Sequence, residues 1–499
     1  MPAAIEMQNI SKNFSGVQAN QNIDFTLEQN EVHCLLGENG AGKTTLMNIL
    51  FGMYNQDSGE IYVNGEKANW SNPMEAIKYG LGMVHQHFML VNRLTVLENI
   101  ILGSDKLNLF WDRKSREKEV AELIDHYNFN IDLNAKIENL SVGMKQRVEI
   151  IKTLYRGADI IILDEPTAVL TSVEVEELFN IINDLIDDGK SIVFITHKLN
   201  ETMKISDRIT VLRDGKKIKT LNTKETNPDK LAELMVGRKV NFSVDKSVTD
   251  YENEVFSVEN LSLGFDKNKE VSFRIKAGEI LGVAGVQGNG QLELEELIMG
   301  IKLAQKGKMT FQEHNITETS TKKRRKLGMG FIPSDRQKRG ILPDFSLEEN
   351  MILGYHNFRP YSKKLFLNQK NITKNTIQLI KDYDIRPPHN KKKIAQFSGG
   401  NQQKVIVSRE ISQDPDFILA SQPTAGLDVG SIEYIHNLLI KLRESGKAIL
   451  LISSELDEIF KLADRIAVIY EGEFKDIKPS KEFDLKEIGL LMSGEEVSQ

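Results

Sequence analysis

The chain has 499 residues, which is enough for two or more domains, and its 40% apolar and 27% charged residues are typical of globular proteins. The formal net charge of −7 argues against bulk nucleic-acid binding, and the single cysteine, Cys34, excludes an intrachain disulfide framework and fits a reducing compartment. Neither an apolar signal core at the N-terminus nor a run of about 18 apolar residues is present, so we expect a cytosolic chain without a membrane span.

The first strong signal is a strand, a glycine-rich loop and a helix. Val32–Leu36 are largely apolar and suit a buried strand, and Leu46–Leu50 suit a helix. The intervening residues fit the phosphate-loop pattern G-x-x-x-x-G-K-[ST]. The candidate nucleotide-binding residues here are Gly37, Glu38, Asn39, Gly40, Ala41, Gly42, Lys43, Thr44 and Thr45.

Each residue type in this loop has a chemical reason. Glycines allow a tight turn whose backbone N–H groups point at phosphate oxygens, and the helix N-terminus adds a partial positive charge. Lys43 can reach the β- and γ-phosphates, and the Thr44 hydroxyl can bind Mg²⁺. A plain glycine turn is the alternative, but the strand–loop–helix context favours a nucleotide-binding loop.

Later segments predict an α/β domain. Glu60–Gly65 alternates like antiparallel strands around a turn, and Arg113–His126 reads as a charged helix. The apolar runs Ile160–Leu163, Ile192–Ile195 and Ile209–Leu212 suit buried parallel strands. Strands that alternate with helices predict a mainly parallel sheet.

Polar residues follow several of these strands. Asp164 and Glu165 end one strand, where ligands bind in open α/β sheets, so Asp164 can hold Mg²⁺ and Glu165 can polarise the attacking water. His197 follows the next strand and has a capping or core role as its alternative. Gln86 follows a further apolar stretch and can ligate Mg²⁺ and orient water through its amide oxygen.

Two other residues keep two interpretations. Phe14 can stack on an adenine ring, or it can be an ordinary surface or core aromatic. Ser141 begins a helix whose N–H groups can face an anion, or it is simply the N-cap of that helix.

The second half of the chain repeats the first. Residues 23–46 match 271–294 with an offset of 285 − 37 = 248, and 139–150 match 396–407 with an offset of 398 − 141 = 257. The rise in offset indicates net insertions, partly around Arg336–Gly340. We therefore predict domains at 1–240 and 255–499 joined by a polar linker at 241–254.

With these motifs in this order, the chain resembles ATP-binding-cassette (ABC) ATPases, once in each half. It is most similar to twin-cassette ATP-binding subunits of bacterial nucleoside and simple-sugar importers, and four long stretches, at 82–91, 140–150, 155–171 and 420–436, resemble the nucleoside branch. The resemblance implies an α/β fold of two tandem P-loop cassettes. Each would have a mixed, mainly parallel sheet, an antiparallel β subdomain and a helical signature subdomain.

In that family, two cassettes close head to tail, and each ATP lies between one phosphate loop and the other cassette's signature, L-S-G-G-Q. The resemblance implies that Phe14 stacks on adenine and that Gln86 lies in the loop that links ATP to the permease. It makes Asp164 the Mg²⁺-associated acid, Glu165 the general base and His197 the γ-phosphate sensor.

The second half has lost these groups. The residues Lys43, Thr44, Gln86, Asp164, Glu165 and His197 align with Gln291, Leu292, Ser334, Ser421, Gln422 and Ser454. A leucine cannot bind Mg²⁺ and a glutamine cannot accept a proton from water, so we predict no hydrolysis on the second loop. The glycines of that loop remain, which leaves nucleotide binding there open.

The signatures show the opposite asymmetry. The second half keeps FSGGN at 397–401 and the acidic Asp428, whereas the first half has Val142 and Thr171 at the corresponding positions. If the halves pair head to tail within one chain, the intact loop meets the near-consensus signature. Three candidate residues, Ser398, Gly399 and Gly400, would then cap the γ-phosphate that Lys43 holds.

The sequence thus predicts the ATP-hydrolysing subunit of an importer for nucleosides or related small solutes. The resemblance implies ATP and Mg²⁺ as cofactors, with two integral-membrane permease subunits and a substrate-binding (lipo)protein as partners. The chain would lie at the cytoplasmic face of the cell membrane and bind no nucleic acid. A monosaccharide importer ATPase and a soluble twin-cassette ATPase of ribosomes are the alternatives. The basic run at 322–326 is interpreted as a solvated face.

Overall fold

The computed structural model describes residues 2–14, 16–86, 88–103, 113–167, 170, 172–239, 246, 253–266, 269–363 and 366–494. The chain divides into two compact units, Met1–Val240 and Asn241–Gln499. Most of the linker predicted at 241–254 lies outside the described residues, and the first strand of the second unit begins at Glu254.

The first unit combines two sheets with helices. Its elements are β1 (Ile5–Phe14), β2 (Val17–Leu27), β3 (Val32–Gly37), α1 (Lys43–Leu50), β4 (Ser58–Val63), β5 (Glu66–Ala68), α2 (Pro73–Lys78), β6 (Leu81–Val84), α3 (Val96–Ile101), α4 (Arg113–His126), α5 (Val142–Tyr155), β7 (Ile160–Asp164), α6 (Ser172–Asp187), β8 (Ser191–Thr196), α7 (Leu199–Ile205), β9 (Arg208–Arg213), β10 (Lys216–Asn222) and α8 (Pro228–Val236).

The second unit repeats this arrangement. Its elements are β11 (Glu254–Ser262), β12 (Glu270–Lys276), β13 (Ile280–Ala284), α9 (Gln291–Ile298), β14 (Lys308–Phe311), β15 (His314–Asn315), α10 (Thr321–Leu327), β16 (Met329–Ile332), α11 (Leu347–Met351), β17 (Ser362–Lys363), β18 (Phe366–Leu367), α12 (Gln369–Asp382), α13 (Gly399–Ile411), β19 (Phe417–Ser421), α14 (Val429–Glu444), β20 (Ala448–Ser453), α15 (Leu456–Leu462), β21 (Arg465–Tyr470), β22 (Glu473–Pro479) and α16 (Leu485–Ser493). A single π-helical turn, η3 (Arg336–Gly340), follows β16.

The two units share one sheet order. The six-stranded sheet of the first unit runs β10-β9-β3-β8-β7-β6, and that of the second runs β22-β21-β13-β20-β19-β16. In each sheet only the strand at one edge, β10 or β22, pairs antiparallel. Each unit also has a four-stranded antiparallel sheet, β2-β1-β4-β5 or β12-β11-β14-β15. The predicted mixed, mainly parallel core and antiparallel β subdomain are therefore confirmed in both halves.

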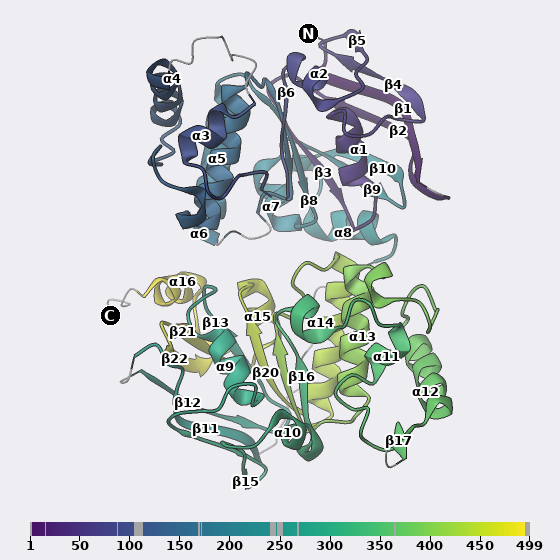
Figure 1. Cartoon of the computed structure of the whole chain (residues 1–499), viewed down its shortest axis with the longest axis vertical. Coiled ribbons are helices and arrows are strands. Elements are labelled where there is room, and N and C mark those ends of the chain that lie inside the picture. Colours follow the sequence, from purple (N-terminus) through teal and green to yellow (C-terminus); the bar gives the residue numbers. More distant parts are fainter. Residues whose placement is uncertain are drawn as a thin grey trace. The chain divides into compact units, whose positions relative to one another are not determined.

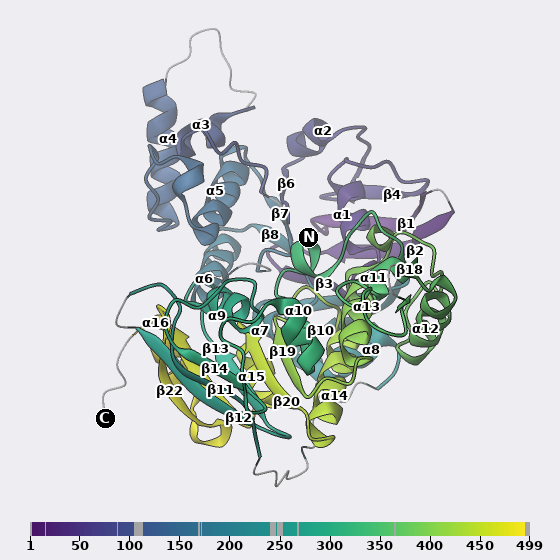
Figure 2. The ribbon, with the colours of Figure 1, turned by 60° about the horizontal axis from the view of Figure 1, so that its bottom comes forward.

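The helices around the signatures lie apart from the antiparallel sheets. In the first unit, α3, α4 and α5 group together on the opposite side of the parallel sheet from β1, β2 and β4, as both ribbon views show (Figures 1 and 2). In the second unit, α11, α12 and α13 group in the same way, away from β11 and β12 (Figure 1). This grouping is the predicted helical subdomain.

Several predicted elements have the expected bounds. The charged segment Arg113–His126 forms α4, and Glu60–Gly65 belongs to the β4–β5 hairpin. The helix predicted over 46–50 begins three residues earlier, at Lys43, because the left-handed Gly42 (φ 97°) directly precedes its first turn. The two halves also begin equivalent helices in the same way. Thr95 and Glu98 form a capping box at the N-terminus of α3, and Ser346 and Glu349 form one at the N-terminus of α11.

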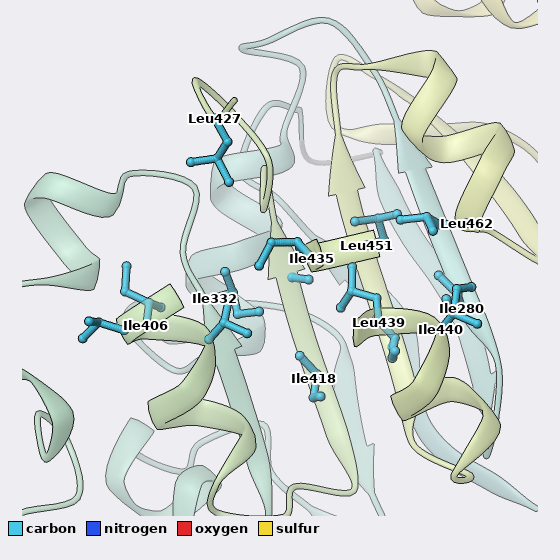
Figure 3. Close-up of a cluster of buried hydrophobic side chains, with 14 of the residues drawn as sticks. Ile280, Ile332, Ile406, Ile418, Leu427, Ile435, Leu439, Ile440, Leu451 and Leu462 are labelled. Carbon is cyan, nitrogen blue, oxygen red and sulfur yellow. The ribbon is translucent and has the colours of Figure 1, made fainter. Parts of the chain in front are cut away.

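Alternating side chains divide the core of the second unit between the two faces of its sheet. Along β20, Ile449 and Leu451 pack with the helices of the signature side, whereas Leu450 and Ile452 pack with α9 and the antiparallel sheet. Figure 3 shows the first of these clusters, in which Ile418 on β19 lies among side chains from the neighbouring strands and from α14. Helix α9 is thereby buried between two sheets, which fixes the position of the loop before it.

Cys34 is fully buried in β3, and burial raises the pKa of its thiol to about 12. It is therefore a small core residue rather than a reactive thiol. Within the described parts of the chain, every helix is too short or too polar to cross a lipid bilayer.

A buried ionic cluster holds the signature helix α13 against β16 and α10. Glu410 is fully buried and accepts hydrogen bonds from Arg325, Arg409, the Tyr355 hydroxyl (2.7 Å) and the Phe331 backbone (3.2 Å). Burial alone would raise the pKa of Glu410, but the two guanidinium groups and these hydrogen bonds lower it below its ordinary value. The carboxylate is thus charged and fully paired.

We expect Glu410→Gln to destabilise the second unit by about 3–5 kcal/mol, because two buried guanidinium groups lose their counter-charge. Hydrogen-exchange protection of peptides from residues 399–411 in the full chain measures this effect locally. The matched control is Asp344→Asn, which removes an exposed ion pair to Lys393 (3.3 Å) in the same unit. Equal protection in both variants would contradict this account of the cluster.

Candidate functional site

The polar residues of the first unit meet at one edge of its sheet. Strands β3, β6, β7 and β8 are parallel, so their carboxyl ends lie at the same edge. The phosphate loop follows β3, Glu165 follows β7, His197 follows β8, and Gln86 lies two residues beyond β6. This edge is where ligands bind in open α/β sheets.

The phosphate loop has no room for larger residues at two of its glycines. A Cβ on Gly37 would stand 2.5 Å from the Leu212 carbonyl oxygen, and one on Gly42 would stand 2.4 Å from that of Ala19. Gly42 also needs its left-handed backbone, and the buried Asn20 side chain donates to its carbonyl oxygen (3.1 Å). Asn20 is a residue that the sequence reasoning missed, because no local pattern marks a hydrogen bond over 22 positions.

Lys43 lies inside the loop rather than in solvent. Its side chain is 5% exposed, and Nζ donates to the carbonyl oxygens of Gly37 (2.8 Å) and Glu38 (3.0 Å). Burial lowers the pKa of this ammonium, while Glu165 and Asp164 oppose the shift. The cation is thereby held by the backbone of the loop, at the place that a phosphate chain would take.

Asp164 and Thr44 form the candidate cation site. Asp164 is 3% exposed, and its Oδ1 lies 3.5 Å from the Thr44 hydroxyl. Burial and the neighbouring Glu165 raise the pKa of Asp164 to about 6. A buried carboxylate with this environment gains from a divalent cation. The described residues offer no cluster of three His, Cys, Asp or Glu, so phosphate oxygens and water would have to complete the coordination.

Glu165 is held by two side chains from neighbouring strand ends. Its Oε1 lies 3.2 Å from His197 Nδ1, and its Oε2 accepts from Gln86 Nε2 (3.1 Å). Burial alone would raise the pKa of Glu165, but the contact with His197 lowers it. The carboxylate is therefore ionised at neutral pH and able to accept a proton, whereas its neighbour Asp164 has a raised pKa.

The turn that carries Glu165 is strained and braced. Glu165 has φ 48°, and its N–H donates to the Ile195 carbonyl oxygen (3.0 Å). Two residues later, the Thr167 hydroxyl donates to Glu201 on α7. Sequence reasoning did not identify Glu201, whose only local signal is its position in a helix after the strand that ends at Thr196.

Among the described residues, Phe14 contacts none of the side chains of this cluster. Its ring is 39% exposed at the end of β1, and it packs edge-on against Tyr54 with ring centroids 5.3 Å apart. The Lys12 ammonium also lies over this ring, 5.5 Å from its centroid. Adenine stacking thus stays a prediction for Phe14.

The first signature begins with a helix cap, which is one of the two roles considered for Ser141. Ser141 is the N-cap of α5 and accepts from the Met144 N–H (3.2 Å). Val142, which replaces the first signature glycine, is 39% exposed. Thr171 lies outside the described residues.

The second phosphate loop is closed by its own glutamine. Gln291 Nε2 donates to the Val286 carbonyl oxygen (2.9 Å), and Gln291 Oε1 accepts from the Asn289 N–H (3.1 Å). The amide thus takes the donor role that Lys43 has in the first loop, and it also uses a backbone N–H that a phosphate would need. Leu292, at the position of Thr44, is 45% exposed and offers no oxygen.

The second unit keeps the turn that carries Glu165 in the first unit, but without the two acids. Gln422 has φ 46° and donates its N–H to the Ile452 carbonyl oxygen (2.7 Å), as Glu165 does to Ile195. Its Oε1 accepts from the Ser454 hydroxyl (3.3 Å), which stands at the position of His197. The aligned residues therefore occupy equivalent places, and the chemistry of the second set is absent.

The second signature is closely packed at its glycines. Ser398 is the N-cap of α13, and a Cβ on Gly400 would stand 2.4 Å from the Ser431 hydroxyl and 3.1 Å from Asp428 Oδ2. Asp428 in turn caps α14 by accepting from the Ser431 N–H (2.8 Å). The structure thus brings two predicted residues, Gly400 and Asp428, together, and Ser398 caps the same helix as Gly400.

Comparison with known proteins finds one family twice in the chain. The family model described as ABC transporter matches residues 20–168 and again 268–425. The chain is 48% identical over 499 residues to the guanosine import ATP-binding protein NupO of Bacillus subtilis (strain 168), covering 99% of this chain and 98% of that protein.

Other relatives have similar coverage. The nucleoside import ATP-binding protein NupA of Lactococcus lactis subsp. cremoris (strain MG1363) is 44% identical over 502 residues, which are 99% of each chain. The glucose import ATP-binding protein TsgD13 of Haloferax volcanii is 41% identical over 527 residues, which are 98% of this chain and 96% of that protein.

A solved structure has a similar fold along most of the chain. The crystal structure of the archaeal ribosomal stalk protein aP1 with the archaeal ribosome recycling factor aABCE1 matches with a TM-score of 0.64 at 19% identity. The match covers 93% of this chain and 89% of that one. At this identity the likeness shows the fold alone.

We expect the parent chain to bind one nucleoside triphosphate, in the first loop, because Gln291 fills the second. Equilibrium dialysis with a non-hydrolysable triphosphate measures the stoichiometry. Lys43→Ala should remove the bound nucleotide, and Gln291→Lys with Leu292→Thr should add a second one. A parent stoichiometry of two, unchanged by Gln291→Lys with Leu292→Thr, would show that the amide does not close the loop.

Proposed function

This chain belongs to the ABC transporter family, whose members hydrolyse ATP, and on that premise we propose that it energises a membrane importer for nucleosides or related small solutes. The cassettes are residues 1–240 and 255–499. The single observation that carries the proposal is the cluster of Lys43, Asp164, Glu165 and His197 at one sheet edge, whose second-half counterparts lack the catalytic groups.

The solute class rests on the relatives. NupO and NupA are import proteins for guanosine and nucleosides, and at 48% and 44% identity they stand above the glucose import protein TsgD13 at 41%. A nucleoside is therefore favoured over a monosaccharide. The ribosome-associated alternative has only a fold likeness in its favour.

The ATP site is shared by the two cassettes. The intact phosphate loop meets the second signature, in which Ser398, Gly399 and Gly400 present the N-terminus of α13 to the γ-phosphate. The degenerate loop with Gln291 meets the first signature with Val142. The intact loop thus pairs with the near-consensus signature, and the degenerate loop pairs with the degenerate signature. This matching supports closure of the two cassettes within one chain.

The proposed mechanism follows from the site's charges. Mg²⁺, held by Thr44 and Asp164 with help from Gln86, would neutralise the phosphate oxygens. Glu165, ionised beside His197, accepts a proton from the attacking water, whose oxygen bonds to the γ-phosphorus as the bond to ADP breaks. Lys43 and the signature N–H groups stabilise the transferring phosphoryl, and Phe14 stacks on the adenine.

The partners follow from the same proposal. Two integral-membrane permease subunits bind the cassettes at the cytoplasmic face of the membrane, and a substrate-binding (lipo)protein delivers the solute. Closure of the cassettes on ATP drives the permease, and hydrolysis at the one intact site reopens them. Nucleic acid has no part in this cycle.

Glu165→Gln should lower ATP turnover by at least about 100-fold, because general-base catalysis contributes that much, and it should leave ATP bound. The matched control is Gln422→Ala at the equivalent turn, which should keep turnover close to that of the parent. Steady-state ATPase assays and nucleotide retention after gel filtration measure both effects. If Gln422→Ala also abolished turnover, the one-site scheme would be wrong.

Uptake of radiolabelled guanosine should fall to background in cells that lack this chain and should return with the parent but not with Glu165→Gln. Uptake of radiolabelled ribose in the same cells is the control and should not change. The reverse pattern, with loss of ribose uptake alone, would leave the ATPase assignment intact and overturn the nucleoside class.

A further inference from the structure

The turn η3 brings a cation to the signature of the second unit. This turn, Arg336–Gly340, begins four residues after the last residue of β16, Ile332, and it contacts the signature helix α13. The Gln337 side chain donates to Gln402 Oε1 (2.9 Å), and Arg409 Nη1 donates to the Gly340 carbonyl oxygen (2.9 Å). These contacts with two successive parts of α13 fix the register of the turn.

Gly340 makes this packing specific. A Cβ at Gly340 would stand 2.5 Å from Ile406 Cδ1, so a larger residue would require the Ile406 side chain or the turn to shift. With Gln337 and Gly340 fixed, the first residue of the turn is held beside the first turn of the helix. Arg336 is that residue.

The guanidinium of Arg336 lies against the first signature glycine. Arg336 Nη2 stands 3.0 Å from the position that a Cβ on Gly399 would take, and its Cζ stands 3.6 Å away. Burial lowers the pKa of Arg336, while Asp335 opposes the shift. Its Nε is buried and has no hydrogen-bond partner among the described residues.

The neighbouring acid is occupied elsewhere. Asp335 caps η3 by accepting from the Lys338 N–H (3.0 Å), and it lies 3.6 Å from Lys338 Nζ. In the part of the chain that the structure describes, the Arg336 guanidinium forms no ion pair. A half-buried cation thus sits next to the positive end of a helix, which is unfavourable unless an anion joins them.

The first unit lacks this arrangement. The equivalent segment of the first half, 87–90, contains no lysine or arginine, and Val142 stands at the place of Gly399. A valine side chain there would occupy the space that the guanidinium uses. Hence the cation accompanies only the signature that, under the proposed function, faces the intact phosphate loop.

We propose that Arg336 is a catalytic residue of the intact ATP site, which contacts the γ-phosphate from the signature side and stabilises the charge on the transferring phosphoryl group. This inference rests on the proposed function, since it requires the second signature to face the loop of Lys43. Arginine is suited to the role because its planar guanidinium binds two phosphate oxygens at once.

The test is ATP turnover by the full chain in membrane vesicles of its own cell. Arg336→Ala should lower kcat at least about tenfold, since arginines that contact the transferring phosphoryl contribute that much or more. Arg336→Lys should recover part of the loss. The matched control is Lys338→Ala, which removes an exposed cation from the same turn and should leave kcat unchanged.

A second readout does not depend on turnover. In the purified Glu165→Gln chain, Arg336→Ala should weaken ATP affinity at least about tenfold, because a charge-assisted contact to the γ-phosphate is lost, and it should leave ADP affinity unchanged. An equal loss for ATP and ADP would mean that the variant perturbs the fold, and it would overturn the proposal.

Ser398→Ala separates this inference from the proposed function. If Ser398→Ala lowers turnover and Arg336→Ala does not, Arg336 has no catalytic role and the composite site stands. If neither variant changes turnover, the second signature does not serve the intact loop and both proposals fail. If Arg336→Ala keeps ATP turnover but loses solute uptake, the side chain serves the permease and the catalytic assignment is wrong.

Discussion

Parallel pairing of β3 with β8 and of β8 with β7 is the constraint on which the site depends. Because side-by-side parallel strands end at one edge, residues as far apart as Lys43 and His197 come together without any local signal. Helix α1 is buried between this sheet and the antiparallel sheet, so the loop before it cannot move independently. The candidate catalytic groups are therefore carried by strand ends that the core holds in place.

Comparison of the two halves separates fold from chemistry. Glu165 and Gln422 share a left-handed backbone, with φ 48° and 46°, although neither residue type favours it. Each turn is held by a hydrogen bond from its N–H to the neighbouring strand. The strain is thus imposed by the sheet, and it persists in the second half where no carboxylate needs it. A retained turn is evidence of common architecture and not of retained activity.

The sequence predicted most of the fold and the identity of the loop residues, because apolar periodicity and glycine spacing are local signals. It did not predict how Gln291 closes its loop or how Arg336 meets Gly399. Both depend on side-chain directions set by packing across the unit, and no spacing rule encodes them. Asn20 and Glu201 were missed for the same reason. Phe14 could be proposed from the sequence as a residue that stacks on adenine. Neither the sequence pattern nor its contact with Tyr54 shows which group stacks on its ring.

The asymmetry of the two loops has a physical consequence for the second one. Gln291 replaces a buried ammonium with a neutral amide, so the second loop needs no anion to balance a cation, and its amide satisfies a backbone donor as well as an acceptor. The first loop has the opposite property, because Lys43 is a desolvated cation whose pKa is lowered by burial. Under the proposed function, a phosphate chain would therefore stabilise the first loop and gain little from the second. A glutamine in place of the lysine thus removes the cost of leaving that loop empty.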